Sequence, residues 1–303
     1  LDAVKKITEG ADLSTKDELH QGLINLGINN ILIPEENGGL GLDLLFASAV
    51  SQSLGEGIAT LPFVGPYVIA PIAIKYGASD SQKEKLFNEM SQNLINCGVG
   101  FSEYFGSRDS SDLSISNNKI TGRTLFVLDV DFASHVMLCD KKGQIGLVSL
   151  KSKGIEIIDL TTVDKTRTYK EMIFKDTPIE ILDKTKTSTE AAEMALSAGR
   201  IVAAADSLGA SQAMINKAVE YSKERKQFNR VIGSFQAVKY MCAEMTAELE
   251  PCYSLVWHAA HSFDDSHEDS KLMACLAKSH TSDVSKMVSK KATEVHGGMG
   301  FTD

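Results

Sequence analysis

The chain has 303 residues, of which 43% are hydrophobic, and a formal net charge of −9 at pH 7. This length and apolar content are enough to bury a large core divided into two or three domains. The negative charge argues against nonspecific binding to nucleic acid, because neutralising phosphates requires clustered lysine and arginine. An anionic ligand would therefore need a locally basic site.

Cysteine spacing and hydropathy indicate the redox compartment and whether the chain binds zinc or spans a membrane. The five cysteines show no CxxC pattern, which favours free thiols in a reducing compartment and argues against a zinc site. No apolar run approaches the ~18 residues that a transmembrane helix requires, and the N-terminus lacks a signal-peptide pattern. We expect a cytoplasmic protein without a metal or a membrane span. The chain starts without methionine and ends within a motif, so we expect both ends to be cut.

Residues 1–96 have mostly helical apolar spacing. The breaker Pro34–Leu42 separates an apolar helical segment from a second one at Leu45–Leu54, and Pro62 to Pro66 precede another at Tyr67–Tyr76. A polar start at Asp80 then introduces a helix through about Met90. We expect a helical N-terminal domain over residues 1–96.

Residues 97–183 have the shorter period of β-strands. Several runs are separated by glycine, aspartate, asparagine and lysine, at the spacing of a small antiparallel β-barrel or sandwich. We expect a middle domain over residues 97–183 with strands at Ile120, Leu125–Leu128, His135–Cys139, Ile145–Leu150, Ile155–Leu160 and Glu171–Phe174.

Residues 184–303 return to helix in three long segments, at about 188–225, 235–263 and 269–295. Apolar residues recur every three or four positions from Phe235 to Leu249, and Pro251 is expected to kink or divide the second helix. Three amphipathic helices need a fourth to close a bundle, which we expect beyond the chain end. The predicted fold is mainly α with a central β domain.

Two segments carry the chemistry of a candidate binding site. Arg225–Gln236 is basic and aromatic, and His296–Asp303 contains three glycines within four residues. Arg225 offers several donors to a diphosphate, Phe228 offers an aromatic face, and glycines let a ligand approach the backbone. Alternatively, Arg225 caps one helix and the glycines only end another.

Together with the helix–sheet–helix order and the turn at Ile33–Leu42, these segments resemble the acyl-CoA dehydrogenase family over essentially the whole chain. The resemblance implies FAD bound between the β domain and the C-terminal bundle, with part of its site supplied by a neighbouring subunit. It places near FAD the residues Arg225, Gln227, Phe228, Ile232, Gln236, Glu294, Gly297 and Gly298.

The β domain departs from the family pattern. Phe101–Asp109 keeps only fragments of the usual Thr-Glu-Pro-x-x-Gly-Ser-Asp stretch, and Arg123–Asp129 stands where many members have Trp-x-Thr. By resemblance, Ser102 bonds the flavin edge, Phe126 packs on the ring and the Leu128 backbone bonds it. Core packing of Phe126 and Leu128 is the alternative. The departure is similar to a divergent subclass associated with bulky or steroid-type acyl chains and paired subunits.

The expected reaction needs a carboxylate that removes the α-proton of a thioester. In the family this glutamate usually follows the His-Gly-Gly turn, so we expect it beyond Asp303. A minority of members place it where this chain has Gly199, before an arginine that matches Arg200. Arg200 is either a cation that organises the pocket or part of an ion pair. Asp206 is either a displaced base or, as we favour, a structural carboxylate.

The resemblance predicts FAD-dependent α,β-dehydrogenation of an acyl-CoA, in fatty acid or steroid side-chain degradation, with electrons passed to an electron-transfer flavoprotein. It also predicts a homo- or hetero-oligomer. Two alternatives stay open. One is a non-catalytic or FAD-binding partner subunit of a heteromeric enzyme, and the other is a flavin oxidase or monooxygenase on the same fold.

Overall fold

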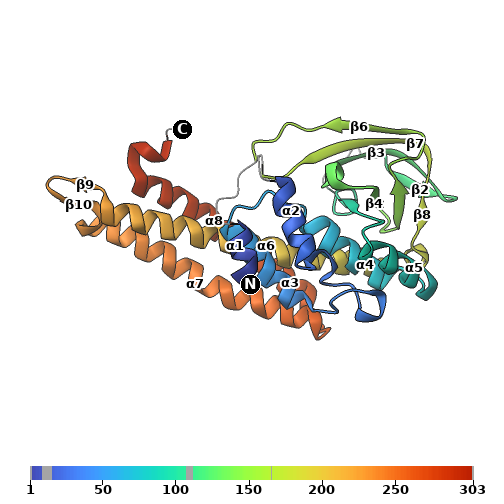
Figure 1. The fold of residues 1–303 in the computed structure, drawn as a ribbon, viewed down its shortest axis with the longest axis horizontal. Helices are drawn as coiled ribbons and strands as arrows, with labels where there is room; N and C mark the ends of the chain where they lie inside the picture. Colours follow the sequence, from blue (N-terminus) through green and yellow to red (C-terminus); the bar gives the residue numbers. More distant parts are fainter. Residues whose placement is uncertain (1, 9–15, 107–111, 165, 302–303) are drawn as a thin grey trace. The chain divides into compact units, whose positions relative to one another are not determined.

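Figure 1 shows a computed structural model of the chain, which describes residues 2–8, 16–106, 112–164 and 166–301. The chain forms two compact units. The bundle unit contains residues 1–11, 48–59 and 200–303, and the sheet unit contains residues 12–47 and 60–199.

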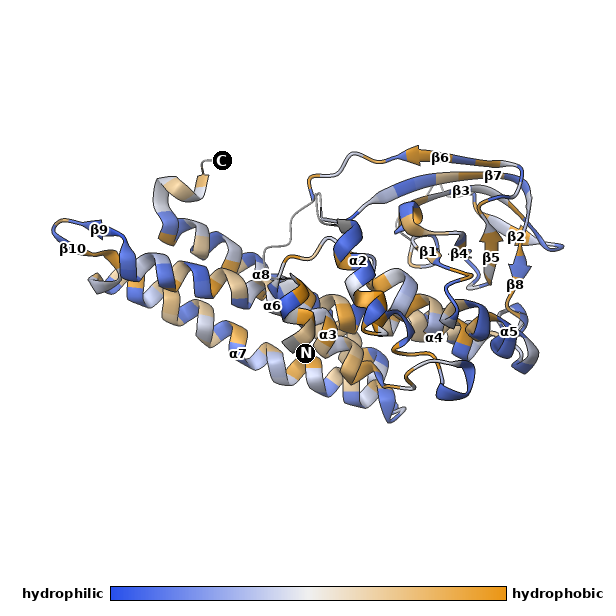
Figure 2. Ribbon diagram, viewed as in Figure 1, coloured by the Kyte–Doolittle hydropathy of each residue, from blue (hydrophilic) through white to orange (hydrophobic). Residues whose placement is uncertain are grey.

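The sheet unit begins with short helices joined by tight turns. Its α-helices are α2 (Lys16–Asn25), α4 (Ala70–Gly77) and α5 (Asp80–Ser91), and a π-helical turn, η4 (Gly65–Ile69), leads into α4. Helix α4 is apolar along most of its length (Figure 2). Most of its residues are also buried. At the start of α5 the Ser79 N–H donates to Gln82 Oε1 at 3.1 Å, which satisfies a backbone donor that the helix itself leaves free.

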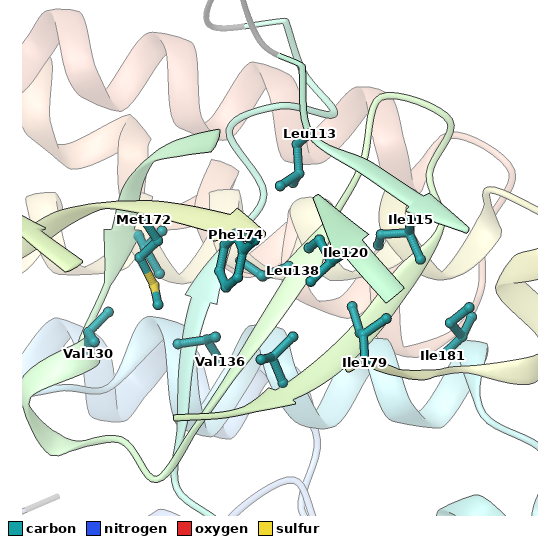
Figure 3. Packing of buried hydrophobic residues seen from close by; sticks show 12 residues of the cluster. Leu113, Ile115, Ile120, Val130, Val136, Leu138, Met172, Phe174, Ile179 and Ile181 are labelled. Atoms are coloured by element: carbon teal, nitrogen blue, oxygen red, sulfur yellow. The ribbon is translucent and has the colours of Figure 1, made fainter. Parts of the chain in front are cut away.

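Among the described residues, eight strands form one sheet in the order β6-β7-β3-β1-β4-β5-β8, with β2 paired to β3. The predicted strand positions are largely confirmed. The strands are β1 (Cys97–Gly100), β2 (Ser114–Ser116), β3 (Lys119–Leu128), β4 (His135–Cys139), β5 (Ile145–Ser149), β6 (Ile155–Asp159), β7 (Tyr169–Pro178) and β8 (Glu180–Ile181). Their buried faces meet in a core that includes Ile120, Val136, Leu138, Met172 and Phe174 (Figure 3).

One strand pair departs from the antiparallel arrangement that the sequence predicts. Strands β1 and β4 are parallel, with Cys97 opposite His135. The chain leaves β1, forms the β2–β3 hairpin, and lays β3 antiparallel on one side of β1 before β4 enters on the other side. The observed order has β6 and β8 at its two ends.

Among the described residues, five α-helices belong wholly or partly to the bundle unit. They are α1 (Asp2–Thr8), α3 (Leu44–Glu56), α6 (Glu190–Glu224), α7 (Gln236–Asp264) and α8 (Ser270–His296). The last three confirm the predicted long helices. Apolar residues from α6, α7 and α8, including Leu208, Met245, Leu249 and Val288, form the core.

Pro251 does not divide α7, which is helical on both sides of it. Proline inside a helix costs about 3 kcal/mol. Its flanking residues Leu249 and Cys252 are buried in the bundle core, as are Met245 and Val256. Each such apolar side chain contributes about 1.5–3 kcal/mol on burial, so packing of this face outweighs the lost backbone bond.

Changes from helix to strand occur between Ser91 and Cys97, and from strand to helix between Ile181 and Glu190. These transitions lie close to the expected limits at residues 96 and 184. The division into three domains stays a prediction, because the compact units group the residues differently.

Gly209 lets α6 and α3 approach closely within the bundle unit. A Cβ added at Gly209 would lie 1.9 Å from the carbonyl oxygen of Gln52. We expect Gly209→Ala to destabilise the protein by about 1–3 kcal/mol, because this overpacking exceeds the roughly 1 kcal/mol that alanine gains in helix propensity. Urea denaturation measures the change, with Gly298→Ala as the control because its added Cβ meets no atom within 4 Å. An unchanged or raised stability of Gly209→Ala would contradict this account of the helix crossing.

Candidate functional site

The Arg225 segment forms a tight hairpin at the end of α6. Strands β9 (Lys226–Gln227) and β10 (Arg230–Val231) pair antiparallel, and the two loop residues between them, Phe228 and Asn229, have φ of 54° and 63°. Two consecutive positive φ angles are typical of the turns that join closely paired strands. The Ile232 N–H donates to the Arg225 carbonyl at 2.8 Å and closes the base of the hairpin.

The glycine segment forms a second turn at the end of α8. Gly297 has φ of 59° and ψ of −135°, a conformation that favours glycine, and its N–H donates to the Glu294 carbonyl. Residues Gly297–Phe301 continue as a short 3₁₀ helix, η8. An added Cβ at Gly297 or Gly298 would meet no atom within 4 Å, so their bare backbones face open space.

One ring contact brings the two turns together. Tyr221 of α6 stacks on His296 of α8 with ring centroids 4.6 Å apart and an interplanar angle of 26°. The His296 Nδ1–H donates to the Ala292 carbonyl at 2.7 Å, which fixes the proton on Nδ1 because a carbonyl can only accept. Arg225 lies one helical turn beyond Tyr221, and Gly297 follows His296 directly.

The result is a pocket of about 660 Å³ in the bundle unit, which we call the terminal pocket. Its lining is mainly aromatic and apolar, with one guanidinium and the glycine backbone. The lining residues are Tyr221, Arg225, Gln227, Phe228, Ile232, Phe235, Val238, Val295, His296, Gly297, Gly298 and Met299.

The two arginines of the hairpin have different surroundings. The guanidinium of Arg230 lies 3.9 Å from the Phe235 ring centroid in a cation–π contact. Arg225 is exposed, and within the described part of the chain its side chain makes no hydrogen bond or ion pair. Its donors therefore remain available, so the pocket suits a ligand that combines an anionic group with a planar ring.

Six of the eight residues predicted for this site line the terminal pocket: Arg225, Gln227, Phe228, Ile232, Gly297 and Gly298. Gln236 and Glu294 do not line it. Gln236 donates to the Tyr240 hydroxyl at 2.6 Å. The predicted site residues do not include the other lining residues, which are Tyr221, Phe235, Val238, Val295, His296 and Met299. The position of Tyr221, four residues before Arg225 on the same helix face, was the available signal.

The remaining predicted residues of the β domain lie in the sheet unit. Phe126 has φ of 54°, is 46% exposed and meets Tyr169 edge-on at 6.2 Å. Leu128 pairs with Val99 and Tyr169 across the sheet. Ser102 is buried and its hydroxyl donates to the Leu125 carbonyl at 2.6 Å. Residues 107–109 of the segment aligned with the family stretch lie outside the described residues.

Helix α6 carries the candidate catalytic positions. A Cβ added at Gly199 would lie 2.9 Å from Ile69 Cδ1, so Ile69 fills the space beside this position. Arg200 is half-buried and forms no side-chain hydrogen bond or ion pair with the residues that the structure describes. The Asp206 carbonyl lies where a Cβ of Gly55 would be, at 2.0 Å, which places Asp206 at the crossing of α3 and α6.

Two further properties concern ligands and membranes. In the described ranges, no cluster of three or more histidine, cysteine, aspartate or glutamate side chains could hold a metal ion. None of the helices described combines the length and apolar character needed to cross a membrane.

Comparison with known proteins gives consistent matches. A model described as the acyl-CoA dehydrogenase C-terminal domain matches residues 189–303, and one for the N-terminal domain of the same family matches residues 3–93. The chain is 26% identical to a 3-(aryl)acrylate reductase of Clostridium sporogenes, covering 94% of this chain and 81% of that protein. It is 25% identical to the caffeyl-CoA reductase–Etf complex subunit CarC of Acetobacterium woodii, covering 94% and 80%.

Among solved structures, butyryl-CoA dehydrogenase from Megasphaera elsdenii matches with a TM-score of 0.87 at 22% identity, covering 99% of this chain and 88% of that one, which shows a shared fold. The two domain models together match well over half of the chain. The chain therefore belongs to the acyl-CoA dehydrogenase family, whose members are FAD-dependent flavoprotein oxidoreductases that act on CH–CH donors.

Proposed function

We propose that this protein oxidises the α,β bond of an acyl-CoA thioester with bound FAD and passes the electrons to an electron-transfer flavoprotein. The observation that carries the proposal is the terminal pocket, where an unpaired guanidinium, aromatic faces and an open glycine backbone meet. Membership of an FAD-dependent family supplies the identity of the ligand.

The residues of the terminal pocket fit part of FAD. Arg225 would donate to the diphosphate, and Phe228, whose side chain is 87% exposed, would offer a ring face. The open space over Gly297 and Gly298 would let phosphate oxygens approach the backbone. Gln227 and Ile232 would complete the wall. Gln236 and Glu294 stay proposed as more distant neighbours.

In the sheet unit, the exposed ring of Phe126 would pack on the flavin, and the Leu128 backbone would bond it. When bound, FAD supplies a hydride acceptor for the β-carbon of the thioester. The polypeptide must orient the acyl chain, exclude water and remove the α-proton with a carboxylate. Arg200, without a partner among the described residues, is proposed to organise the charge of that pocket.

The base itself is not assigned to position 199 of α6. No carboxylate projects from position 199, where Ile69 fills the space. Asp206 stays a candidate, but its place at the crossing of α3 and α6 favours a structural role.

The electron acceptor and the assembly are also proposals. The Acetobacterium relative is named as a subunit of a complex with Etf, which supports an electron-transfer flavoprotein as partner. An oligomer would complete the FAD site from a neighbouring subunit, and the exposure of Phe228, Met299 and Phe301 beside the terminal pocket is consistent with such a neighbour or with the cofactor.

A second candidate is the opposite direction, reduction of an α,β-unsaturated acyl group. Two relatives carry names of reductases that act on aryl acrylates or caffeyl-CoA. Both directions use the same cofactor and the same two carbon atoms, so they differ in the potential of the bound flavin and in the electron partner rather than in the pocket.

Anaerobic addition of acyl-CoAs tests the proposed oxidation. The FAD-loaded protein should lose its visible flavin absorbance with at least one member of a series of straight-chain, aryl and ring-bearing acyl-CoAs. Retained absorbance with the whole series, together with oxidation of a prereduced sample by the matching enoyl-CoAs, would favour the reductive direction. Retained absorbance in both arms would favour a non-catalytic subunit, and fast reoxidation by air alone would favour an oxidase.

Arg225→Ala tests the diphosphate site. Loss of a hydrogen-bonded charged group weakens binding by about 1.5–3 kcal/mol, so the dissociation constant of FAD should rise about ten- to a hundredfold. Titration of apoprotein followed by flavin fluorescence measures it. Lys223→Ala is the control, because it removes an exposed positive charge two residues away that does not line the terminal pocket. If both variants raise the dissociation constant of FAD equally, Arg225 contributes only its positive charge and not a specific contact with the diphosphate.

Gly298→Ala tests the approach to the backbone. Its added Cβ meets no protein atom within 4 Å, so the free energy of unfolding of the apoprotein should be unchanged. The same methyl group would stand between the backbone and a bound phosphate, so FAD affinity should fall about tenfold or more. Chemical denaturation and FAD titration separate the two effects. Undiminished affinity would remove Gly298 from the proposed site.

A further inference from the structure

Strand β3 contains a bulge next to the exposed ring of Phe126. Thr124 pairs with Met172 and Val127 pairs with Lys170, so β3 advances three residues while β7 advances two. The extra residue bends β3 between these pairs, and Phe126 takes a left-handed φ of 54°. An aromatic residue adopts this conformation only where its surroundings hold it there.

On the side of β3 that faces β1, Leu125 has no strand partner among the described residues. Continuing the register that joins Val99 to Leu128 would place residue 102 opposite Leu125, but β1 ends at Gly100. The backbone groups of Leu125 on this side therefore lack a ladder partner, and buried backbone groups need one.

Two consecutive side chains supply those partners. The Ser102 hydroxyl donates to the Leu125 carbonyl at 2.6 Å, and the Leu125 N–H donates to Glu103 Oε1 at 3.4 Å. Ser102 is 3% exposed and Glu103 is 1% exposed, so both contacts are shielded from water. The hydroxyl of Ser102 also lies 3.3 Å from Glu103 Oε1, which ties the two side chains to each other.

Glu103 is an expensive residue to bury for packing alone. Its second oxygen, Oε2, is buried without a hydrogen-bond partner, and no cation pairs with its carboxylate in the part of the chain that the structure describes. An apolar side chain of similar volume would avoid this desolvation. The contact that an apolar residue could not make is the one with the Leu125 N–H.

We propose that Ser102 and Glu103 are positioning residues that bind both backbone groups of Leu125, its carbonyl and its N–H, and so hold the strained Phe126 ring toward the flavin. The assignment of the ring to the flavin rests on the proposed function, whereas the clamp itself concerns the apoprotein. In this scheme Ser102 acts through Leu125 and Phe126 rather than by touching the cofactor.

A single-tryptophan reporter tests the clamp without cofactor. Trp257 is the only tryptophan, so the double variant Trp257→Phe/Phe126→Trp reports on position 126 alone. In apoprotein, Ser102→Ala and Glu103→Leu should each speed the anisotropy decay of this tryptophan and increase its quenching by acrylamide. Glu103→Gln, which keeps an acceptor oxygen, should restore most of the parent behaviour.

Thr177→Val is the matched control. The Thr177 hydroxyl is equally buried and donates to the Gly154 carbonyl at 2.9 Å, but at the opposite end of β7 from the bulge. It should lower stability without changing the reporter. Thermal unfolding shows whether each variant is folded. If Glu103→Leu does not fold, the result for Ser102→Ala tests the clamp by itself.

Unchanged anisotropy and quenching in folded Ser102→Ala and Glu103→Leu would overturn the proposed clamp on Leu125.

FAD titration and the flavin spectrum of the same variants, with Phe126 in place, test whether the clamp positions the Phe126 ring toward the flavin. We expect the FAD dissociation constant to rise about tenfold, the effect of one lost contact of roughly 1.4 kcal/mol, together with a shifted visible band. If the tryptophan reporter changes but the FAD dissociation constant and the flavin spectrum do not, the proposed role of the clamp in flavin binding is overturned. A parent protein that binds no FAD would instead refute the proposed function and leave the apoprotein result standing.

Discussion

The stacking of Tyr221 on His296 is the contact on which the terminal pocket depends. It joins the ends of two long helices whose sequences lie 75 positions apart, and the hydrogen bond from His296 to the Ala292 carbonyl fixes the ring that Tyr221 meets. Everything else in the pocket follows from chain continuity. The Arg225 hairpin begins one turn after Tyr221, and the left-handed Gly297 turns the chain immediately after His296. The bundle core, which includes Ala218 of α6 and Val295 of α8, supports the same approach of the two helix ends.

Much of this arrangement could be predicted from local patterns. The three-to-four-residue spacing of apolar side chains located α6, α7 and α8 within a few residues, and the alternating runs located β4, β5 and β6. Long-range pairing could not be predicted in the same way. Strands β1 and β4 align in parallel, and β3 contains a bulge, because of which strands become neighbours. The residue types at Cys97 and Leu125 do not predict these neighbours. Pro251 leaves α7 undivided for a related reason, because tertiary burial outweighs a local helix breaker.

The site shows the same division between local and long-range information. A guanidinium, an exposed aromatic and bare backbones could be selected by chemistry alone, and six of the selected residues line one pocket. The sequence does not predict what surrounds a given glycine. Gly209 is required because a neighbouring helix backbone occupies the place of a Cβ, whereas Gly298 faces open space. The two glycines therefore differ in their surroundings, since Gly209 permits close helix packing and Gly298 leaves its backbone open.

Close packing along α6 also limits where catalytic chemistry can reside. The helix approaches α3 at Gly209 and at Asp206, and the Ile69 side chain rests against Gly199. A longer side chain at position 199 would have to displace Ile69, because protein interiors leave few voids that could receive it. The close contact at Gly199 thus leaves no room for a carboxylate at that position unless Ile69 moves. On the proposed reaction, α6 contributes the frame and the cation Arg200, and position 199 does not supply the proton-abstracting group.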